Sequence, residues 1–413
     1  MPRTAPDLTI PITQARTFWR ARQGLAAPLG DTATAAVERT GWARTLGGVD
    51  VYLALRARHP SLTRAALEEA VSRGALRVVP AVRGCIYLAP ARDVPVVLAL
   101  AADLTRARSE RDLDRAGLPR REVEALADAI DGVLKAGPKT TPAIRKALPD
   151  GAIRNLGEKG KKAGISSPLP VALRELEFAG RIERIPVGAR LDTEKYEWRR
   201  AKPAKRASAG RDFAERVQLV ARRFFEWFGP ATLKELTAWS GLTARDAKAA
   251  VAALPLVPVA IEGHADDAWA LEADRDALVD ASPTASFDFL AFEDNLLIIH
   301  GGPGAHADAA YHDRPLASWG MQKPTTLGAA KHIAWRTILF KGEIIGYWEY
   351  DLDKGELVHA LFDGPPKGQK RALAQRSEEL AAFLRDDLGH ARSFSLDTDE
   401  AIRARVAGLR AMQ

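Results

Sequence analysis

The stretch FAERVQLVARRFFEWFGPATLKELTAWSGLTARDAKAAVAALPLVPVAIEGHADDAWAL, residues Phe213–Leu271, decides the fold. Its first part carries apolar side chains at the spacing of an amphipathic helix, at Val217, Val220, Phe224, Phe225 and Phe228. Gly229-Pro230 predicts the end of that helix, with the glycine as a left-handed cap, and Ser240-Gly241 predicts a sharp turn between two shorter helices. Two strands are then expected around Glu262–Asp267. This order predicts a winged helix-turn-helix, which usually lays its third helix in the DNA major groove.

The third helix of this unit, Thr243–Leu254, has a polar face. Thr243 suits its N-terminal cap, because a threonine hydroxyl accepts a hydrogen bond from the first turn. Arg245 and Lys248 are expected on the exposed face together with Thr243. Two interpretations stay open for these three side chains: contact with DNA, or a solvated surface that keeps the protein soluble.

Similar patterns occur twice earlier in the chain. Val37–Leu88 predicts a first winged helix, with Arg83 near the tip of its wing. Gly137-Pro138 repeats the Gly229-Pro230 pattern and introduces a second unit, whose longer helix is expected over Pro170–Ala179. Three such units predict tandem winged helices that share neighbouring surfaces.

Two basic segments accompany the second unit. Lys135–Lys162 contains eight lysines and arginines against two acidic residues. Its insertion, Pro149–Ser167, has a glycine-rich centre that predicts a mobile loop. Trp198–Arg211 holds six basic residues and no acid, as expected of a linker. The insertion would grip DNA phosphates or form a solvated surface, and the candidate phosphate contacts are Arg154, Lys159, Lys161 and Lys162.

The N-terminal part adds a helix and an unusual loop. A helix is expected over Ile12–Ala26, with three arginines facing solvent: Arg16, Arg20 and Arg22. Thr40–Gly48 is aromatic, basic and closed by two glycines, and it is interpreted as a loop held by Trp42.

The C-terminal part predicts a small sheet with helices. Residues 266–313 contain eleven acidic residues against Arg275, so this face is not expected to approach phosphates. The expected strands are Ser286–Ile299, Trp335–Phe340, Ile344–Tyr350 and Glu356–Phe362, and the expected helices are Gln369–Leu388 and Asp399–Met412.

These patterns together predict an α+β protein: three tandem winged helix-turn-helix units, then a small C-terminal β-sheet domain with a long helix. The expected domains are 1–110 with the N-terminal helices and first winged helix, 111–200 with the second, 211–281 with the third, and 282–413 with the sheet.

Composition narrows the class of protein. The 413 residues carry a net charge of +7 and a sequence pI of about 9.5, which favours a polyanionic partner such as double-stranded DNA. The single cysteine, Cys85, excludes an internal disulfide and is typical of a reducing cytoplasm. No signal peptide and no apolar run long enough to span a membrane is expected. We therefore expect a cytoplasmic monomer without membrane contact or an obligate protein partner.

Much of this sequence resembles the winged-helix family of AlkZ- and YcaQ-like DNA glycosylases. The similar segments are Arg20–Ala26 (RARQGLA), Tyr52–Pro60 (YLALRARHP), Val82–Pro90 (VRGCIYLAP), Phe228–Leu254, Phe289–Ile298 (FLAFEDNLLI) and Arg336–Asp351 (RTILFKGEIIGYWEYD). The resemblance implies stacked winged helices and a C-terminal sheet domain that form a C-shaped body with a basic cleft. It also implies hydrolysis of the N-glycosidic bond of an alkylated or crosslinked base.

Active members of that family use a Gln-apolar-Gln or Gln-apolar-Asp motif shortly before the segment that resembles Tyr52–Pro60. Such oxygens stabilise the positive charge that develops on the sugar and orient the attacking water. Here the aligned position holds Arg44-Thr45-Leu46, and a cationic Arg44 would oppose that charge. The nearest carboxylate is Asp50, which either takes the catalytic role or caps the helix Val51–Arg58.

Other polar clusters were weighed for chemistry. Glu293 and Asp294 lie within the apolar strand Ser286–Ile299 and would pair across the sheet or face the cleft. A loop with His300, His306 and His312 offers metal ligands, but its spacing matches no zinc site. We interpret that loop as solvated and predict no metal and no cofactor.

The sequence thus leads to two hypotheses of different classes. The first is a protein that binds damaged or modified duplex DNA and hydrolyses a base–sugar bond without a metal. The second is a non-catalytic winged-helix DNA-binding protein with a regulatory or structural role. A carboxylate or amide oxygen in the cleft beside Arg44 would favour the first hypothesis, and an apolar or purely cationic cleft floor would favour the second.

Overall fold

The Phe213–Leu271 stretch folds into helices and strands in the predicted order. A computed structural model describes residues 6–202, 212–264, 267–316 and 325–413. Asp212 and Glu215 form a capping box at the start of the first helix of this stretch, α10. The elements are α10 (Phe213–Phe228), β8 (Ala231–Thr232), α11 (Leu233–Ser240), α12 (Ala244–Ala252), β9 (Leu256–Ile261) and β10 (Ala268–Leu271).

The helix end at Gly229 was predicted correctly, but its left-handed cap was not. Gly229 has φ −66° and ψ 150°, which is extended backbone. A Cβ atom there would lie 2.7 Å from the Phe225 carbonyl oxygen, so the glycine is needed for space. The left-handed cap occurs instead at Gly241, after α11.

The first and second units repeat the order of helix, short strand, two or more helices and two strands. In each, the short strand joins the hairpin as an edge of a small sheet, in the orders β2-β4-β3 and β5-β7-β6. The first unit comprises α2 (Ala33–Thr40), β2 (Ala43–Arg44), α3 (Asp50–Arg58), α4 (Arg64–Ser72), β3 (Leu76–Pro80) and β4 (Ile86–Pro90). The second comprises α6 (Arg120–Val133), β5 (Lys139–Thr140), α7 (Thr141–Ala147), α8 (Gly157–Ala163), α9 (Pro168–Phe178), β6 (Ile182–Pro186) and β7 (Tyr196–Arg200).

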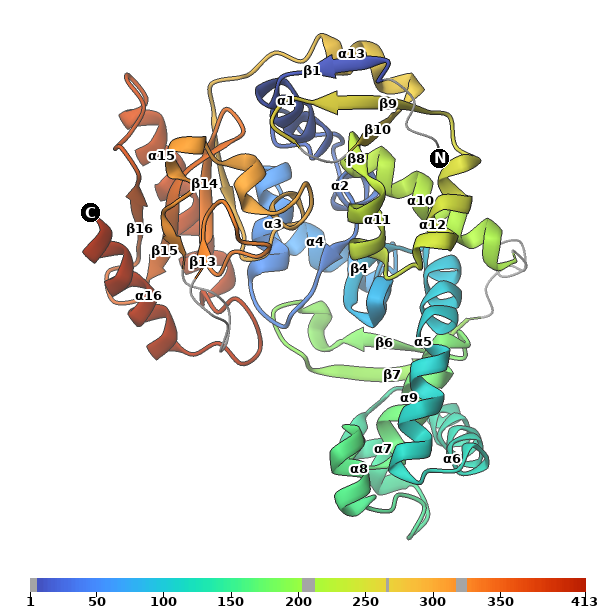
Figure 1. Cartoon of the computed structure of the whole chain (residues 1–413). Helices are drawn as coiled ribbons and strands as arrows, with labels where there is room; N and C mark the ends of the chain where they lie inside the picture. The colour runs from blue at the N-terminus through green and yellow to red at the C-terminus, as the bar shows by residue number, and fades with distance from the viewer. Residues whose placement is uncertain (1–5, 203–211, 265–266, 317–324) are drawn as a thin grey trace.

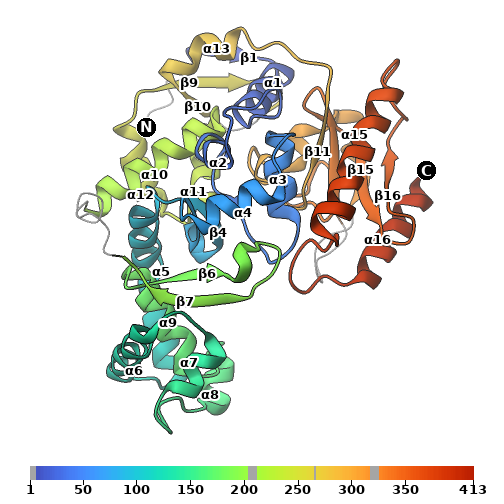
Figure 2. The same ribbon diagram turned by 180° about the vertical axis from the view of Figure 1, so that it is seen from behind.

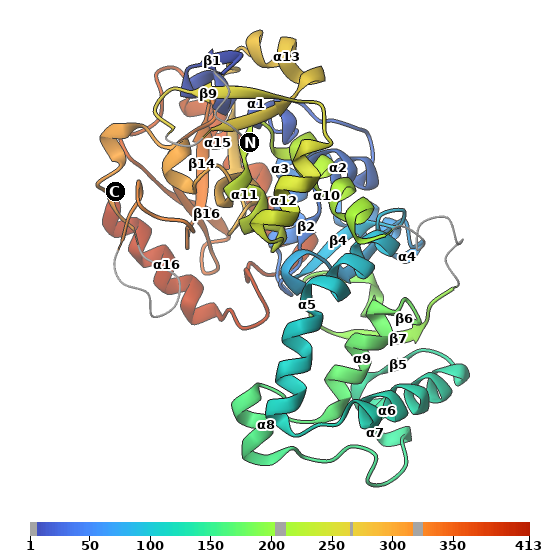
Figure 3. The same ribbon diagram turned by 45° about the vertical axis from the view of Figure 1, so that its right-hand side comes forward.

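The helices of the second unit form a lobe that projects from the main body, whereas its β6–β7 hairpin packs against the first unit. Figures 1 and 3 show the long helix α5 (Val94–Ala116) running from the body to α6–α9. The apolar residues of the lobe, including Ile130 and Leu176, form a core cluster of their own. The basic segment predicted as a linker lies partly outside the described residues, because it includes residues 203–211.

The insertion in the second unit contains a helix, which contradicts the prediction of a mobile loop. Gly157–Ala163 forms α8, and Gly164 ends it in the left-handed conformation. Leu156 is buried in the core of the lobe, with Ile165 packed against that core. A Cβ atom on Gly160 would lie 2.3 Å from the Ile165 carbonyl oxygen. The glycine therefore permits close packing of the helix rather than mobility.

The C-terminal domain has the predicted hairpin and third strand. Its antiparallel sheet has the order β11-β14-β15-β16, followed by α15 and α16. The strand expected over Ser286–Ile299 is shorter than predicted, because Asp294 caps a short helix instead. The elements are β11 (Phe287–Leu290), α14 (Asn295–Ile298), β14 (Arg336–Phe340), β15 (Glu343–Asp351), β16 (Glu356–Leu361), α15 (Lys370–Ala382), a π-helical turn (Phe383–Leu388) and α16 (Asp399–Met412).

The N-terminal segment contacts both the third unit and the C-terminal sheet. Strand β1 (Leu8–Ile10) pairs in parallel with β9, which no pattern in the sequence predicted. Helix α1 (Ile12–Arg22) follows, and the expectation that its arginines face solvent was wrong for Arg16 and Arg20. Arg20 is buried against Asp288, with Nη2 2.9 Å from Oδ1. Arg16 donates to Glu343 at 2.6 Å, so these cations connect α1 to the C-terminal sheet.

The main body shares its apolar cores between domains. One cluster joins the first unit to the C-terminal sheet, and Figure 2 shows α3 beside β11. Another joins the first unit to the third through Trp42 and Trp227. The remaining short elements are α13 (Arg275–Val279), β12 (Pro315–Leu316), β13 (Thr325–Thr326) and short 3-10 turns over Val82–Gly84, Leu134–Ala136, Val187–Ala189, Glu272–Asp274, Pro303–His306 and Ala309–Tyr311. Within the described residues, no helix has the length and apolar character needed to cross a membrane.

Candidate active site

The segment Thr40–Gly48 is held as predicted by Trp42. The indole nitrogen of Trp42 donates to Asp93 at 3.0 Å, and its ring lies 5.2 Å from that of Trp227. Directly after it, Ala43 and Arg44 form strand β2, which pairs with β4. This pairing fixes the backbone of Arg44 and leaves its side chain to enter a pocket beside α3.

The two glycines that close this segment make room for the C-terminal chain. A Cβ atom on Gly48 would lie 2.3 Å from the carbonyl carbon of Ser393 and 2.4 Å from the Arg392 carbonyl oxygen. The Val49 backbone donates to Arg392 at 2.8 Å. The C-terminal domain thus packs directly over the loop that aligns with the family motif.

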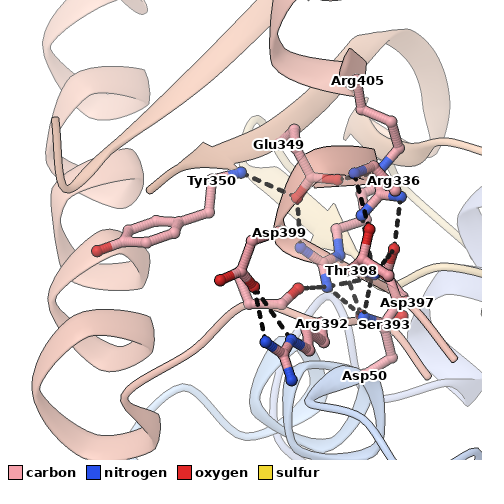
Figure 4. A network of polar contacts seen from close by, with 12 residues as sticks. Asp50, Arg336, Glu349, Tyr350, Arg392, Ser393, Asp397, Thr398, Asp399 and Arg405 are labelled. Atoms are coloured by element: carbon pink, nitrogen blue, oxygen red, sulfur yellow. Dashed lines mark hydrogen bonds and ion pairs between the residues drawn. The ribbon is translucent and has the colours of Figure 1, made fainter. Parts of the chain in front are cut away.

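Asp50 is buried in an ion-pair network rather than exposed (Figure 4). Its Oδ1 lies 2.9 Å from Arg336, whose guanidinium also donates to Glu349 at 2.6 Å and to Ser393 at 3.0 Å. Burial raises the pKa of Asp50 to about 6, although the charge of Arg336 opposes this shift. Asp50 begins α3 one residue after the N-cap, Val49, and its side chain accepts from Arg336. Its catalytic role stays a prediction.

Arg44 and Glu293 meet across the pocket. Arg44 Nη1 donates to Glu293 Oε2 at 2.6 Å, and His332 Nδ1 lies 3.1 Å from Glu293 Oε1. Burial opposes ionisation of Glu293, but the hydrogen bond from His332 and the charge of Arg44 outweigh it and lower the pKa of this carboxyl. Glu293 also has φ 53°, a backbone conformation that costs energy in a residue other than glycine. Strain of this kind is concentrated at functional sites.

The remaining acid at this pocket, Asp294, has a structural partner. Arg58 donates to both of its carboxylate oxygens at 2.8 Å, and the pair is buried. Asp294 Oδ1 also accepts from the Leu296 backbone at 3.0 Å. The Asn295 side chain donates to the Trp42 carbonyl oxygen at 3.0 Å, so the Glu293–Asn295 segment is bound firmly to the motif loop.

The structure therefore brings together Arg44, Asp50, Glu293 and Asp294, which all line one pocket. Among the described residues that line this pocket, the carboxylates are Asp50, Glu293 and Asp294. Glu293 is paired with the partly exposed Arg44 and with His332, whereas Asp50 and Asp294 are paired with the buried Arg336 and Arg58. His332 was not anticipated, because no local pattern in the sequence marks it. The role of Arg336 was also missed, although it begins a strand that the family resemblance had singled out.

The residues predicted to contact DNA lie on separate elements. Lys159, Lys161 and Lys162 are exposed on α8 of the lobe. Arg154 is already engaged, with Nε 2.8 Å from Glu122. Arg83 is exposed at the turn between β3 and β4.

On the third unit, Thr243 caps α12 as predicted by accepting from the Asp246 backbone at 3.2 Å. Arg245 and Lys248 are exposed on the same helix. The exposure of these side chains does not by itself show contact with DNA, so their roles stay predictions.

The histidine-containing loop is not solvated, contrary to expectation. His300 and His306 are buried, and His300 stacks on Trp19 with ring centroids 3.8 Å apart. Burial lowers the pKa of His306 to about 3, so its imidazole is neutral. Within the described residues, no group of three or more histidine, cysteine, aspartate or glutamate side chains is placed to hold a metal ion.

Comparison with known proteins gives a consistent family assignment. A family model described as "DNA glycosylase AlkZ-like" matches residues 48–383. Among solved structures, Streptomyces sahachiroi DNA glycosylase AlkZ is similar, with a TM-score of 0.67 and 17% sequence identity. The match covers 93% of this chain and 98% of that chain, and at this identity it shows a shared fold. No curated protein matches the chain.

Proposed function

This chain belongs to the family of AlkZ-like DNA glycosylases, and on that premise we propose that it binds damaged or modified duplex DNA and hydrolyses the N-glycosidic bond of an alkylated base. Family membership assigns the DNA glycosylase-like, DNA-binding function. The bond that is cleaved and the groups that act on it are the proposal. It is supported chiefly by one observation, the carboxylate of Glu293 beside Arg44 in the pocket at the family's motif position.

Glu293 is the carboxylate best suited to the chemistry. Cleavage of the bond between C1′ and the base builds positive charge on the sugar, and an ionised carboxylate stabilises that charge. The lowered pKa keeps Glu293 ionised at neutral pH. Asp50 and Asp294 are paired with the buried arginines Arg336 and Arg58, whereas Glu293 is paired with the partly exposed Arg44 and with His332.

The reaction needs only water as a second reactant. A purine alkylated at N7 carries positive charge, so it leaves with the electron pair of the C1′–N9 bond without prior protonation. The water oxygen forms the new bond to C1′, and its proton passes to a base and then to solvent. The products are the free base and an abasic site. Arg44 would oppose the cationic sugar if it were unpaired, but Glu293 offsets its charge.

The non-catalytic alternative expects an apolar or purely cationic pocket floor. Glu293 supplies a carboxylate oxygen at that floor, so the geometry favours hydrolysis.

We further propose that the three repeated units are winged helices that hold the duplex, with domains at 1–110, 111–200, 211–281 and 282–413. The exposed residues Arg83, Lys159, Lys161, Lys162, Arg245 and Lys248, together with Thr243 and Arg154, are the proposed DNA contacts. Their positive charge would be neutralised by phosphates, with release of counterions. The proposal also includes a monomer in a reducing cytoplasm, supported by the single Cys85.

The test is base excision under single-turnover conditions. Duplexes containing N7-methylguanine or N3-methyladenine are incubated with protein, treated with alkali and scored for strand scission, with a protein-free duplex as background. Wild-type protein should give scission, and Glu293→Gln should lower its rate about 100-fold or more. The matched control is Glu356→Gln, because Glu356 is exposed at the start of β16, outside the pocket.

Three results would count against this proposal. Absence of wild-type scission on every alkylated duplex rejects hydrolysis of this class of base. Full activity in Glu293→Gln rejects the assigned carboxylate. Loss of activity in a folded Asp50→Asn variant, with Glu293→Gln still active, would return the role to Asp50.

A further inference from the structure

A second pocket lies beside His332, the imidazole partner of Glu293. The pocket at the motif position has a cavity volume of about 30 Å³, enough for a water molecule or two. The second has a volume of about 220 Å³ and is lined by residues of the first unit, the third unit and the C-terminal domain. His332 lines the larger pocket and lies 3.1 Å from Glu293, which lines the smaller one.

The rim of the larger pocket is cationic. Arg83, Lys234 and Lys331 contribute positive charge, and His264 and His332 add imidazoles. Among the described residues that line it, Glu235 is the acid, and its carboxylate accepts from the Thr232 backbone at 2.7 Å in a capping box. An anion such as a phosphate would therefore meet a net positive surface.

One wall of the same pocket is apolar. It comprises Trp239 and Ala238 on α11, together with Ile298 and Ile299. Trp239 is held by the aromatic cluster around Trp42, with ring centroids 5.8 Å apart. Flat apolar walls of this kind favour the face of a nucleobase, whichever base it is.

Glycines shape the backbone that brings the charges to the rim. A Cβ atom on Gly302 would lie 2.4 Å from the Ala330 carbonyl oxygen, so this glycine lets its loop pack directly on the chain that leads to Lys331. A Cβ atom on Gly241 would lie 3.1 Å from Arg83 Cγ, so the glycine that ends α11 supports the side chain of Arg83. The pocket is thus formed by contacts between domains.

We infer that this pocket receives one nucleotide turned out of the DNA duplex, with its base against the Trp239–Ile299 wall and its phosphate among Arg83, Lys331 and His264. The inference rests on the proposed function, which it deepens by separating the place of the base from the place of the attacking water. Enzymes that act on a base extrude it from the stack, because the reacting atoms cannot be reached inside the duplex. The cationic rim matches the phosphate of such a nucleotide, and His332, which lines the pocket, contacts the proposed catalytic carboxylate of Glu293.

A steric variant tests the pocket without removing charge. Ala238 is exposed on α11 and lines the wall, so Ala238→Trp should fill the pocket while the helix stays folded. Ala374→Trp is the matched control, because Ala374 is exposed on α15 and does not line the pocket. Binding is measured by fluorescence anisotropy with an intact duplex and with a duplex that contains 2′-fluoro-N7-methyldeoxyguanosine, whose sugar resists depurination.

Wild-type protein should bind the modified duplex about tenfold more tightly than the intact one. Ala238→Trp should lose that preference, keep its affinity for intact duplex and excise N7-methylguanine about 100-fold more slowly. Ala374→Trp should match wild type in all three measurements. Lys331→Ala should weaken the preference in the same direction, with Lys367→Ala, an exposed lysine near α15, as its control.

The outcomes separate this inference from the function on which it rests. Suppose that the wild-type protein is active and that Ala238→Trp has the same binding preference and the same excision rate. That result would overturn the assignment of the pocket and leave the proposed function unaffected. The assignment of the pocket is also overturned if the wild-type protein excises the base without preferring the modified duplex and Ala238→Trp excises it equally fast. Failure of wild-type protein to bind any duplex would overturn both.

Discussion

Arg44 and Glu293 are 249 residues apart in the sequence, yet their side chains form a hydrogen bond of 2.6 Å. The contact joins strand β2 of the first unit to the segment that precedes α14. The cation of Arg44 is therefore accompanied by an acid from a distant segment of the chain. Against the effect of burial, the hydrogen bond from His332 and the charge of Arg44 lower the pKa of Glu293.

The pairing predicts that Glu293 contributes stability in a defined pH range. Its pKa is lowered in the folded protein, so its contribution is fully present above the ordinary glutamate pKa and is lost as pH falls through the folded value. The Tm difference between wild type and Glu293→Gln should therefore be largest near neutral pH and shrink toward pH 3. In an Arg44→Ala background the shrinkage should begin at higher pH. A Tm difference that stays constant with pH would contradict the ion pair.

Substitution by alanine is expected to change stability in opposite directions at Gly48, which is closely packed, and at Gly132, which is not. Gly48→Ala should lower Tm, because its Cβ would meet the backbone of Arg392 and Ser393, at a cost of about 1–3 kcal/mol. Gly132 is exposed in α6 with open space around it, so Gly132→Ala should raise stability by roughly 0.5–1 kcal/mol. Thermal unfolding of both variants gives the comparison. An unchanged Tm in Gly48→Ala would mean that the C-terminal chain does not lie over this loop.

The buried pair Arg20–Asp288 predicts a large loss of stability. Asp288→Asn leaves a buried guanidinium without its carboxylate, which costs about 3–5 kcal/mol. The control is Asp353→Asn, which removes a pair with Arg403 whose side chains are 63% and 50% exposed and should cost no more than about 1 kcal/mol. Denaturant or thermal unfolding measures both. Equal effects would show that α1 does not depend on the C-terminal domain for its position.

The lysines of α8 predict the salt dependence of DNA binding. Replacing Lys159, Lys161 and Lys162 with alanine should flatten the plot of log affinity against log salt by about 0.9 for each phosphate contact that is lost. The control removes three exposed lysines of the C-terminal domain, Lys354, Lys367 and Lys370, and should leave the slope unchanged. A slope equal to wild type in the α8 variant would mean that the lobe does not touch phosphate.

Local sequence determined the helices and strands of this protein but not all of the contacts that their side chains make. The helix spacing in Phe213–Leu271, the cap at Thr243 and the hairpin around Lys341-Gly342 depend on neighbours a few residues away, so they could be predicted. The same local patterns predicted the α+β class, and the family resemblance added an expected position for the motif loop. The expected motif position holds Arg44-Thr45-Leu46, so the resemblance alone left the catalytic group open.

Tertiary structure decided which polar side chains are buried and with what partners. Arg20 lies on a helix whose pattern favours solvent, yet Asp288, 268 residues away, neutralises it in the interior. Likewise, only folding brings Glu293 to Arg44, places Asp50 against Arg336 and buries His300 on Trp19. Hydrophobic periodicity and helix capping depend on residues within one or two helical turns, so both can be recognised in a single sequence. The pairing of charges across domains depends on distances in space that no local pattern encodes.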